Sequence, residues 1–176
     1  MNNVASEYGF SINLELYEKS KTYDIIIGGL IYSKQIEYIF HLYDFIGYFE
    51  DSIVVLGLSK NNYDLETFKS SKDEEIGFLM YSYSYYLLKQ YFPKSKIYAY
   101  EDDILKDLIN SKIQYIVADK NYFIIPQIYK QQIKLLGEIY KEIYGFLVLK
   151  SRADLKNIIQ KVISKLDFKE TLKWLK

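Results

Sequence analysis

Short apolar runs alternate with amphipathic stretches along most of the chain. Residues 23–27, 52–58 and 113–119 form runs that are rich in β-branched residues and bounded by glycine or polar residues. Runs of this length and composition are typical of buried β-strands. Gly28 and Gly29 follow the first run, and such a pair favours a turn or lets a ligand approach the backbone closely. We therefore predict three buried strands, the first of which ends at the glycine pair.

The order of elements between residues 75 and 119 predicts a parallel sheet. Strands are expected at 75–80, 96–100 and 113–119, and amphipathic helices at 82–91 and 103–110 lie between them in the sequence. A β-α-β-α-β order with short connections requires right-handed crossovers and gives a largely parallel sheet. The chain is therefore expected to belong to the α/β class.

The flanking segments predict shorter elements. Residues 64–68 have the pattern of one helical turn, and residues 33–40 form a brief amphipathic segment. Ser151-Arg152-Ala153-Asp154 matches a variant of the capping box, which opens a helix. The remaining predictions are short strands within 8–16, 133–136 and 145–150, a helix with Leu155, Ile158, Ile159, Val162 and Leu166 on its inner face, and a terminal helix that carries Leu172, Trp174 and Leu175.

Asp119 is the candidate for binding a positively charged group. It ends a predicted buried strand, and Lys120 and Asn121 turn the chain away. Ligands of open α/β sheets bind beyond the carboxyl ends of the strands. The alternative is that Asp119 caps the next helix, and the residues alone favour this capping interpretation.

Composition excludes several kinds of site. The 176 residues include no cysteine, so disulfides, thiolate catalysis and cysteine metal sites are absent. His41 is the only histidine, and Arg152 is the only arginine. Histidine metal clusters are therefore excluded, and bidentate grips on carboxylate or phosphate are scarce. The formal net charge of zero points to neither nucleic acid nor an anionic membrane. We expect no cofactor, no metal and no nucleic-acid partner.

The sequence leaves localisation open. Residues 1–7 are polar and lack the apolar core of a signal peptide. No run approaches the roughly 20 apolar residues that span a bilayer. We expect neither a signal peptide nor a transmembrane segment.

Several segments, taken in order, resemble the type II periplasmic solute-binding proteins, and within them the polar amino-acid receptors of ABC transporters. The resemblance covers the chain from Gly9 to Lys176. The segments that carry it are YDIIIGGLIYS at 23–33, SIVVLGLSKN at 52–61, EEIGFLMYSYSYYLLKQYFPKSKIYAYED at 74–102, DLINSKIQYIVAD at 107–119, LGEIYKEIYGFLVLKSRADLKNIIQKVISKL at 136–166 and TLKWLK at 171–176.

The resemblance implies two α/β lobes with mainly parallel sheets. Lobe 1 is expected to consist of residues 1–57 and 137–176, and lobe 2 of residues 58–136. The lobes would be joined near residues 56–60 and 133–138, and they would close on a solute in the cleft between them.

In lobe 2 the resemblance implies ligand contacts from two segments. Asp119 matches the aspartate that pairs with the ligand's α-ammonium group. Tyr81 and Ser82 match a Gly-Thr turn, where a helix N-terminus offers amide and hydroxyl groups to a carboxylate. Ser82 keeps the hydroxyl, whereas Tyr81 replaces the glycine. Tyr83 is a further candidate, because tyrosines near a cleft can stack on apolar or cationic ligands.

In lobe 1 the implied contacts come from the turn after the first strand. Backbone groups of Gly29, Leu30 and Ile31 would face the solute, and Ser33 matches a threonine of the family. The family arginine that clamps the ligand carboxylate matches Ile36. Neighbouring Lys34 offers only a point charge in its place.

Lobe 1 is also expected to be shortened at its N-terminus. The family's first strand, which carries an aromatic ligand platform, is missing or cut short before Tyr8, and the segment between Leu16 and Tyr23 is brief. The chain would then be either a truncated gene product or a reduced relative. We expect no more than weak affinity for ordinary amino acids.

Three functions compete on this basis. The first is a non-enzymatic solute-binding domain, which captures an amino-acid-like or small polar solute in an interlobe cleft and serves an ABC permease or a membrane sensor. The second is a degenerate or regulatory interaction domain that has lost its ligand, with a possible homodimer formed through an exposed apolar patch. The third is a dehydratase-type enzyme on the same scaffold. Asp119 has no evident partner base, so we expect no enzyme.

Overall fold

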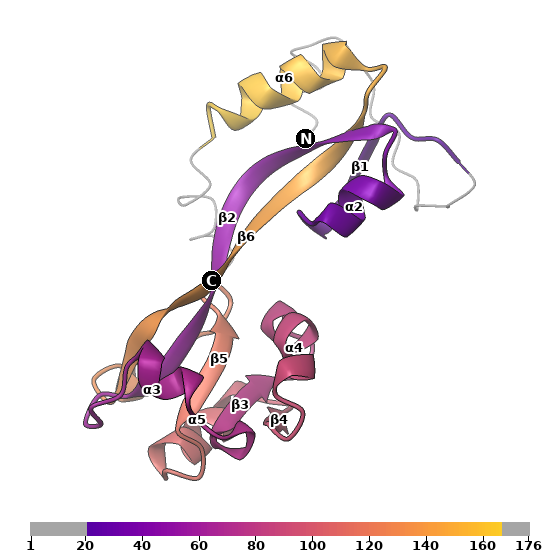
Figure 1. The fold of residues 1–176 in the computed structure, drawn as a ribbon. Helices are drawn as coiled ribbons and strands as arrows, with labels where there is room; N and C mark the ends of the chain where they lie inside the picture. Colours follow the sequence, from indigo (N-terminus) through magenta and orange to yellow (C-terminus); the bar gives the residue numbers. More distant parts are fainter. Residues whose placement is uncertain (1–20, 167–176) are drawn as a thin grey trace. The chain divides into compact units, whose positions relative to one another are not determined.

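The computed structural model describes residues 21–166 (Figure 1). The strand predicted within 8–16, the terminal helix with Trp174 and the expected shortening of lobe 1 lie outside the described residues. None of the helices in the described range combines the length and apolar character that a membrane span requires.

The chain forms two compact units. Unit 1 contains residues 1–50 and 143–176, and unit 2 contains residues 51–142. The lobe limits expected after residues 57 and 136, and the joining segments expected beside them, stay predictions.

Two long strands contribute residues to both units. These are β2 (Tyr43–Leu58) and β6 (Ile133–Leu149). The sequence predicted only 52–58 of β2, and it divided β6 into two short strands. Both predictions were too short, because the missed stretches are largely exposed or half-buried and therefore contain polar residues. A strand that is not buried on both faces lacks the continuous apolar run by which it would be recognised.

The strands follow the order β1-β6-β2-β5-β3-β4, and the sheet is mixed. Within unit 2, β3 (Ile76–Leu79) lies between β4 (Lys96–Tyr98) and β5 (Tyr115–Asp119), and both pairings are parallel. This part confirms the predicted α/β crossovers. The pairing of β2 with β5 is antiparallel, and so is that of β6 with β1 (Ile25–Ile31).

Apolar side chains alternate between the two faces of the unit 2 sheet. In β5, Ile116 and Ala118 belong to one buried cluster, and Tyr115 and Val117 belong to the other. Helix α5 (Glu101–Ile109) covers the first cluster with Ile104, Leu105 and Leu108. Burial of both faces explains why the sequence of this strand is apolar at every position up to Asp119.

Two short helices of unit 2 border these strands. In α3 (Leu65–Lys69), the Asp64 side chain accepts from the Thr67 amide and forms a capping box with it. Helix α4 (Tyr83–Leu88) begins after the Ser82 N-cap and continues as a short 3₁₀ turn, Lys89–Tyr91. Pro93 follows that turn, as the predicted helix end required.

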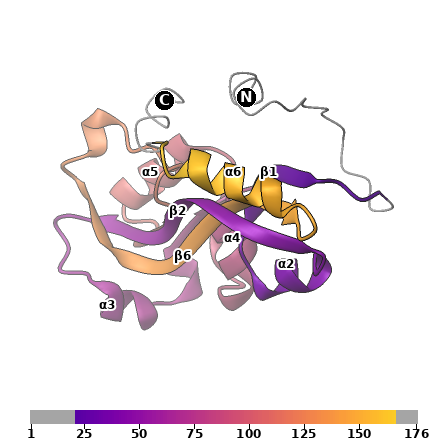
Figure 2. The same cartoon turned by 90° about the horizontal axis from the view of Figure 1, so that it is seen from above.

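Unit 1 has a small core between its strands and one helix. Helix α6 (Ala153–Ile163) lies beside the unit 1 parts of β2 and β6 (Figures 1 and 2). Its Leu155 belongs to one buried cluster with Ile46 of β2 and Val148 of β6. The predicted capping box at Ser151 is wrong: Arg152 occupies the N-cap, and its guanidinium binds the Asp154 carboxylate. Leu166, predicted to face inward, is exposed.

The prediction that β1 ends at the glycine pair is wrong as well. The strand continues through Gly28 and Gly29 to Ile31, and its pairing with β6 shifts register between Ile26 and Leu30. The glycines therefore accompany an irregularity inside the strand, a common place for them. Helix α2 (Lys34–Ile39) follows where the amphipathic segment predicted it.

Tyr81 adopts a backbone conformation that suits glycine. Its φ angle is 66°, and its side chain is 78% exposed. The left-handed region disfavours residues with a Cβ atom by about 1–2 kcal/mol. The matching position of the family has glycine. The turn before α4 therefore keeps a left-handed conformation that suits glycine, although this chain has tyrosine there.

We predict that Tyr81→Gly raises the free energy of unfolding by about 1 kcal/mol, because relief of backbone strain exceeds the added entropy of the unfolded chain. Urea unfolding measures the change. Tyr81→Ala is the matched control, since it removes the same exposed ring and keeps the Cβ atom. Equal stability of the two variants would contradict the interpretation that the backbone is strained at Tyr81.

Candidate functional site

Asp119 is buried at the carboxyl end of β5 and is bonded to a helix. Its side chain is 6% exposed. Oδ2 accepts the Tyr83 amide at 2.9 Å, and Oδ1 accepts the Ser84 amide at 2.8 Å. These amides belong to the first turn of α4, where backbone N–H groups lack intrahelical partners. Asp119 therefore does cap a helix, but the helix is α4, which precedes β5 in the sequence, and not the next helix as predicted.

The Ser82 hydroxyl is also engaged within the protein. Oγ accepts the Tyr85 amide at 3.1 Å and donates to the Leu79 carbonyl at 2.7 Å. It also lies 3.0 Å from Oγ of Ser84. The amide and hydroxyl groups that the resemblance assigns to a ligand carboxylate thus already have protein partners.

The four candidates of unit 2 lie together at the start of α4. Tyr81 forms the left-handed turn, Ser82 is the N-cap, and Tyr83 supplies an amide to Asp119. Burial raises the pKa of the Tyr83 phenol to about 12, and Tyr140, Glu142 and Asp119 add to this increase. The Tyr83 hydroxyl therefore stays protonated at neutral pH.

Two further buried acids lie near Asp119, and the sequence interpretation missed them. Asp51 is 3% exposed and Glu142 is 1% exposed. Asp51 directly precedes the apolar run of β2, so its position at a strand boundary could have identified it. Glu142 stands in a mixed polar stretch and gives no such signal. We call Asp51, Asp119 and Glu142 the acidic cluster.

Asp51 is only half satisfied by the protein. Its Oδ1 accepts from the Ser52 amide and from Nδ2 of Asn121, each at 2.7 Å. Its Oδ2 is buried and accepts no hydrogen bond from the described residues. Burial raises the pKa of this carboxyl; the bonds from Ser52 and Asn121 lower it, and the charge of Asp119 raises it further.

All three acids of the cluster affect the pKa of one side chain, the phenol of Tyr122. Burial raises the pKa of its phenol, and Asp51, Asp119 and Glu142 each contribute to the increase. Lys120, which follows Asp119 in the sequence, binds the Glu138 carboxylate. The acidic cluster therefore creates a negative potential, which favours a cation as ligand.

The candidates of unit 1 lie in β1 and the turn that leads to α2. Gly29 is exposed at the register shift of β1, and Ile31 pairs with Tyr144 of β6. The Ser33 hydroxyl accepts the Ile36 amide at 3.1 Å and caps α2. Like Ser82, Ser33 uses its oxygen in a helix cap.

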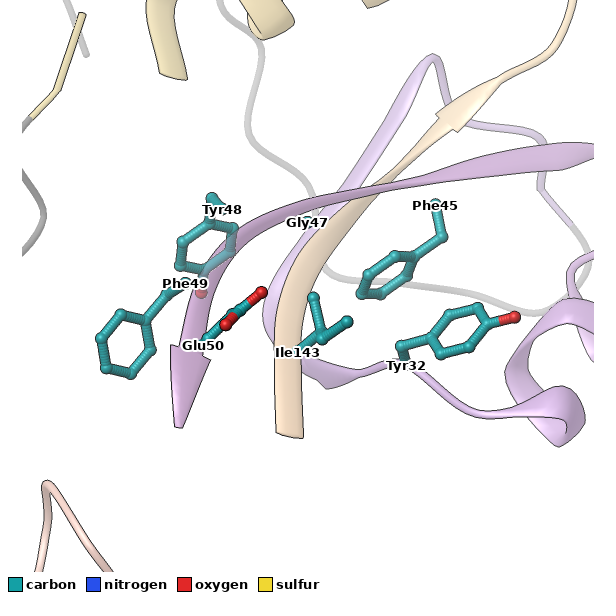
Figure 3. A pocket seen from close by; sticks show the side chains of 7 residues that line it. All are labelled: Tyr32, Phe45, Gly47, Tyr48, Phe49, Glu50 and Ile143. Atoms are coloured by element: carbon teal, nitrogen blue, oxygen red, sulfur yellow. The ribbon is translucent and has the colours of Figure 1, made fainter. Parts of the chain in front are cut away.

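Unit 1 also contains an aromatic pocket that the sequence did not predict. Figure 3 shows the Glu50 carboxylate and Ile143 with Tyr48 and Phe49 on one side and Phe45 and Tyr32 on the other. The pocket has a volume of about 510 Å³, and the centroids of the Tyr32 and Phe45 rings are 5.3 Å apart. Aromatic faces beside a carboxylate suit an organic cation. Of the predicted segment, only Tyr32, between Ile31 and Ser33, lines this pocket.

Within residues 21–166, no group of three or more His, Cys, Asp or Glu side chains is arranged to hold a metal ion. The acidic cluster is therefore not arranged to hold a metal ion.

We predict that Asp51→Asn raises the free energy of unfolding at neutral pH by about 1 kcal/mol, the scale for a buried polar group without a partner. The raised pKa means that stability from protonated Asp51 is full below about pH 4 and is lost as pH rises through that pKa. The advantage of the variant should therefore grow from pH 4 to pH 7 in urea unfolding experiments.

Asp154→Asn is the control, because the contribution of Asp154 to stability changes with pH in the opposite direction. Arg152 lowers the pKa of Asp154 to about 2, so stability from the charged form is present above about pH 4 and is lost toward pH 2. If the gain in free energy of unfolding from Asp51→Asn does not change with pH, the interpretation that Asp51 is a buried charge is wrong.

Comparisons with known proteins find similarity in structure only. No protein-family model matches the sequence, and no curated protein matches it. An ancestral cationic amino acid solute binding protein aligns with a TM-score of 0.62 and 16% identity, over 99% of this chain and 80% of that chain. A Wolinella succinogenes protein, assigned as the binding component of an ABC transporter and complexed with lysine, aligns with a TM-score of 0.60, 16% identity and the same coverage.

A mutant of ArgBP from T. maritima aligns with a TM-score of 0.55 and 16% identity, over 99% of this chain and 80% of that chain. These proteins are all named as binding proteins or binding components. At this level of identity the similarity establishes architecture. The chain therefore has the α/β fold of the type II solute-binding proteins, as the sequence resemblance implied.

Proposed function

We propose that this chain is a solute-binding domain that captures a small amine-bearing solute, amino-acid-like or small and polar, without catalysing a reaction. The observation that carries the proposal is Asp119, a buried carboxylate at the carboxyl end of β5 whose oxygens are held by the first amides of α4. This is the position at which open α/β sheets bind ligands.

The geometry of Asp119 fits it to hold an ammonium group. Two amide bonds fix the orientation of the carboxylate. An ionised carboxylate has about four lone-pair sites, and the two bonds leave capacity for another donor. In a site that excludes water, attraction between carboxylate and ammonium is stronger than in bulk solvent.

The structural neighbours support a solute of this kind. Their names include arginine-binding proteins and a complex with lysine, and another neighbour is a ligand-binding domain in complex with glutamate or serine. These amino acids share an α-ammonium group. We propose by analogy that the solute is delivered to an ABC permease or detected by a membrane sensor.

A second candidate function is an interaction domain that has lost ligand binding, with a possible homodimer. One set of observations favours it: Ser82 and Ser33 use their hydroxyls in helix caps, and Ile36 stands where the family has arginine. A domain without a ligand would keep its polar groups satisfied in this way.

Asp119→Asn should abolish binding of amine-bearing solutes. The variant replaces one carboxylate oxygen by an NH₂ group, which repels an ammonium ion and faces an amide of α4. We expect a loss of stability of about 1–3 kcal/mol as well. Calorimetric titration with a panel of amino acids and amines, at a temperature where both proteins are folded, measures the loss of affinity.

Asp64→Ala separates binding from stability. Asp64 caps α3 and takes no part in the site, so its removal should lower stability and leave affinity unchanged. Solute binding that survives in Asp119→Asn would refute the role of Asp119. If no member of the panel binds the wild-type protein, the second candidate function is favoured.

A further inference from the structure

The Asp51 carboxylate needs a hydrogen-bond donor that the described part of the protein does not supply. Two donors hold Oδ1, whereas Oδ2 is buried without one. Buried charged oxygens normally have a partner, because burial without one is strongly unfavourable. The donor that Oδ2 lacks within the protein is one that a cationic ligand can bring.

The charge balance around Asp51 also favours a cation. Ile53, two residues after Asp51, pairs with Asp119 in the sheet, and Asn121, two residues after Asp119, donates to the Asp51 carboxylate. Lys120, the basic residue next to Asp119, is engaged by Glu138. A single ammonium group would balance only one of the two carboxylates of Asp51 and Asp119, so a ligand with two positive charges is better matched.

The amide and hydroxyl donors that the described residues place at the start of α4 are not free to anchor a ligand carboxylate. The Tyr83 and Ser84 amides are occupied by Asp119, and the Ser82 hydroxyl is occupied by its own cap. Arg152, the only arginine of the chain, binds Asp24 and Asp154 in unit 1. A carboxylate brought to the acidic cluster would meet like charges without a compensating donor.

We propose that the preferred solute is an organic cation without a carboxylate, a primary diamine, and that Asp51 binds one of its ammonium groups alongside Asp119. This inference rests on the proposed function and narrows the class of solute. A primary ammonium has three donors, enough to contact more than one carboxylate of the acidic cluster.

The test compares 1,5-diaminopentane with lysine, because the first is the second without its carboxylate. We expect calorimetric titration to give at least about tenfold tighter binding of the diamine. In Asp51→Asn the affinity for the diamine should fall at least about tenfold, while the melting temperature of the unliganded protein is equal to or above that of the wild type. Asp154→Asn, which removes an exposed acid of unit 1, should leave the affinity unchanged.

Several outcomes would overturn the inference. If lysine binds as tightly as the diamine, the inference fails and the proposed function stands. If Asp51→Asn binds the diamine normally, Asp51 has a purely structural role. Equal losses in Asp51→Asn and Asp154→Asn would mean general attraction to a negative surface. If neither the diamine nor any amino acid binds, the proposed function fails together with the inference.

Discussion

The bond between the Asp119 carboxylate and the first amides of α4 is the interaction on which the candidate site depends. It joins the end of β5 to the start of a helix that lies 35 residues earlier in the sequence. The same bond satisfies a buried negative charge and two amides that would otherwise lack partners. It thereby fixes where the carboxylate lies, and it removes those amides from the donors available to an anionic ligand group.

Electrostatics then decides which solute fits. The acidic cluster collects three buried carboxylates at one region of unit 2, and Asp51 is held there with one oxygen unsatisfied. Placing such a group in the interior lowers stability, and proteins keep unfavourable groups of this kind mainly where function uses them. The aromatic pocket of unit 1, with its single carboxylate at Glu50, has the same preference for a cation. Each unit, considered separately, is suited to positive rather than negative charge.

The sequence predicted the central part of the fold because burial of both sheet faces produces an unambiguous pattern. The strands around 113–119 and 52–58 and the crossover helices between them were recognised for this reason. The half-exposed stretches of β2 and β6 were missed, since polar residues interrupt their pattern. Site prediction was limited in another way: the role of Asp119 at a strand end was visible, but Asp51 and Glu142 join it only through tertiary contacts. Likewise, sequence alone could not tell that Ser82 and Ser33 use their hydroxyls in helix caps.

The central claim is that the buried Asp51 carboxylate belongs to a cation site, and carbon-13 NMR of its carboxyl carbon tests this claim directly. A pH titration of the unliganded protein should give a pKa above the ordinary value for aspartate. With 1,5-diaminopentane bound, the pKa should fall, because a nearby positive charge favours the ionised form. A pKa that saturating diamine leaves unchanged would contradict the account.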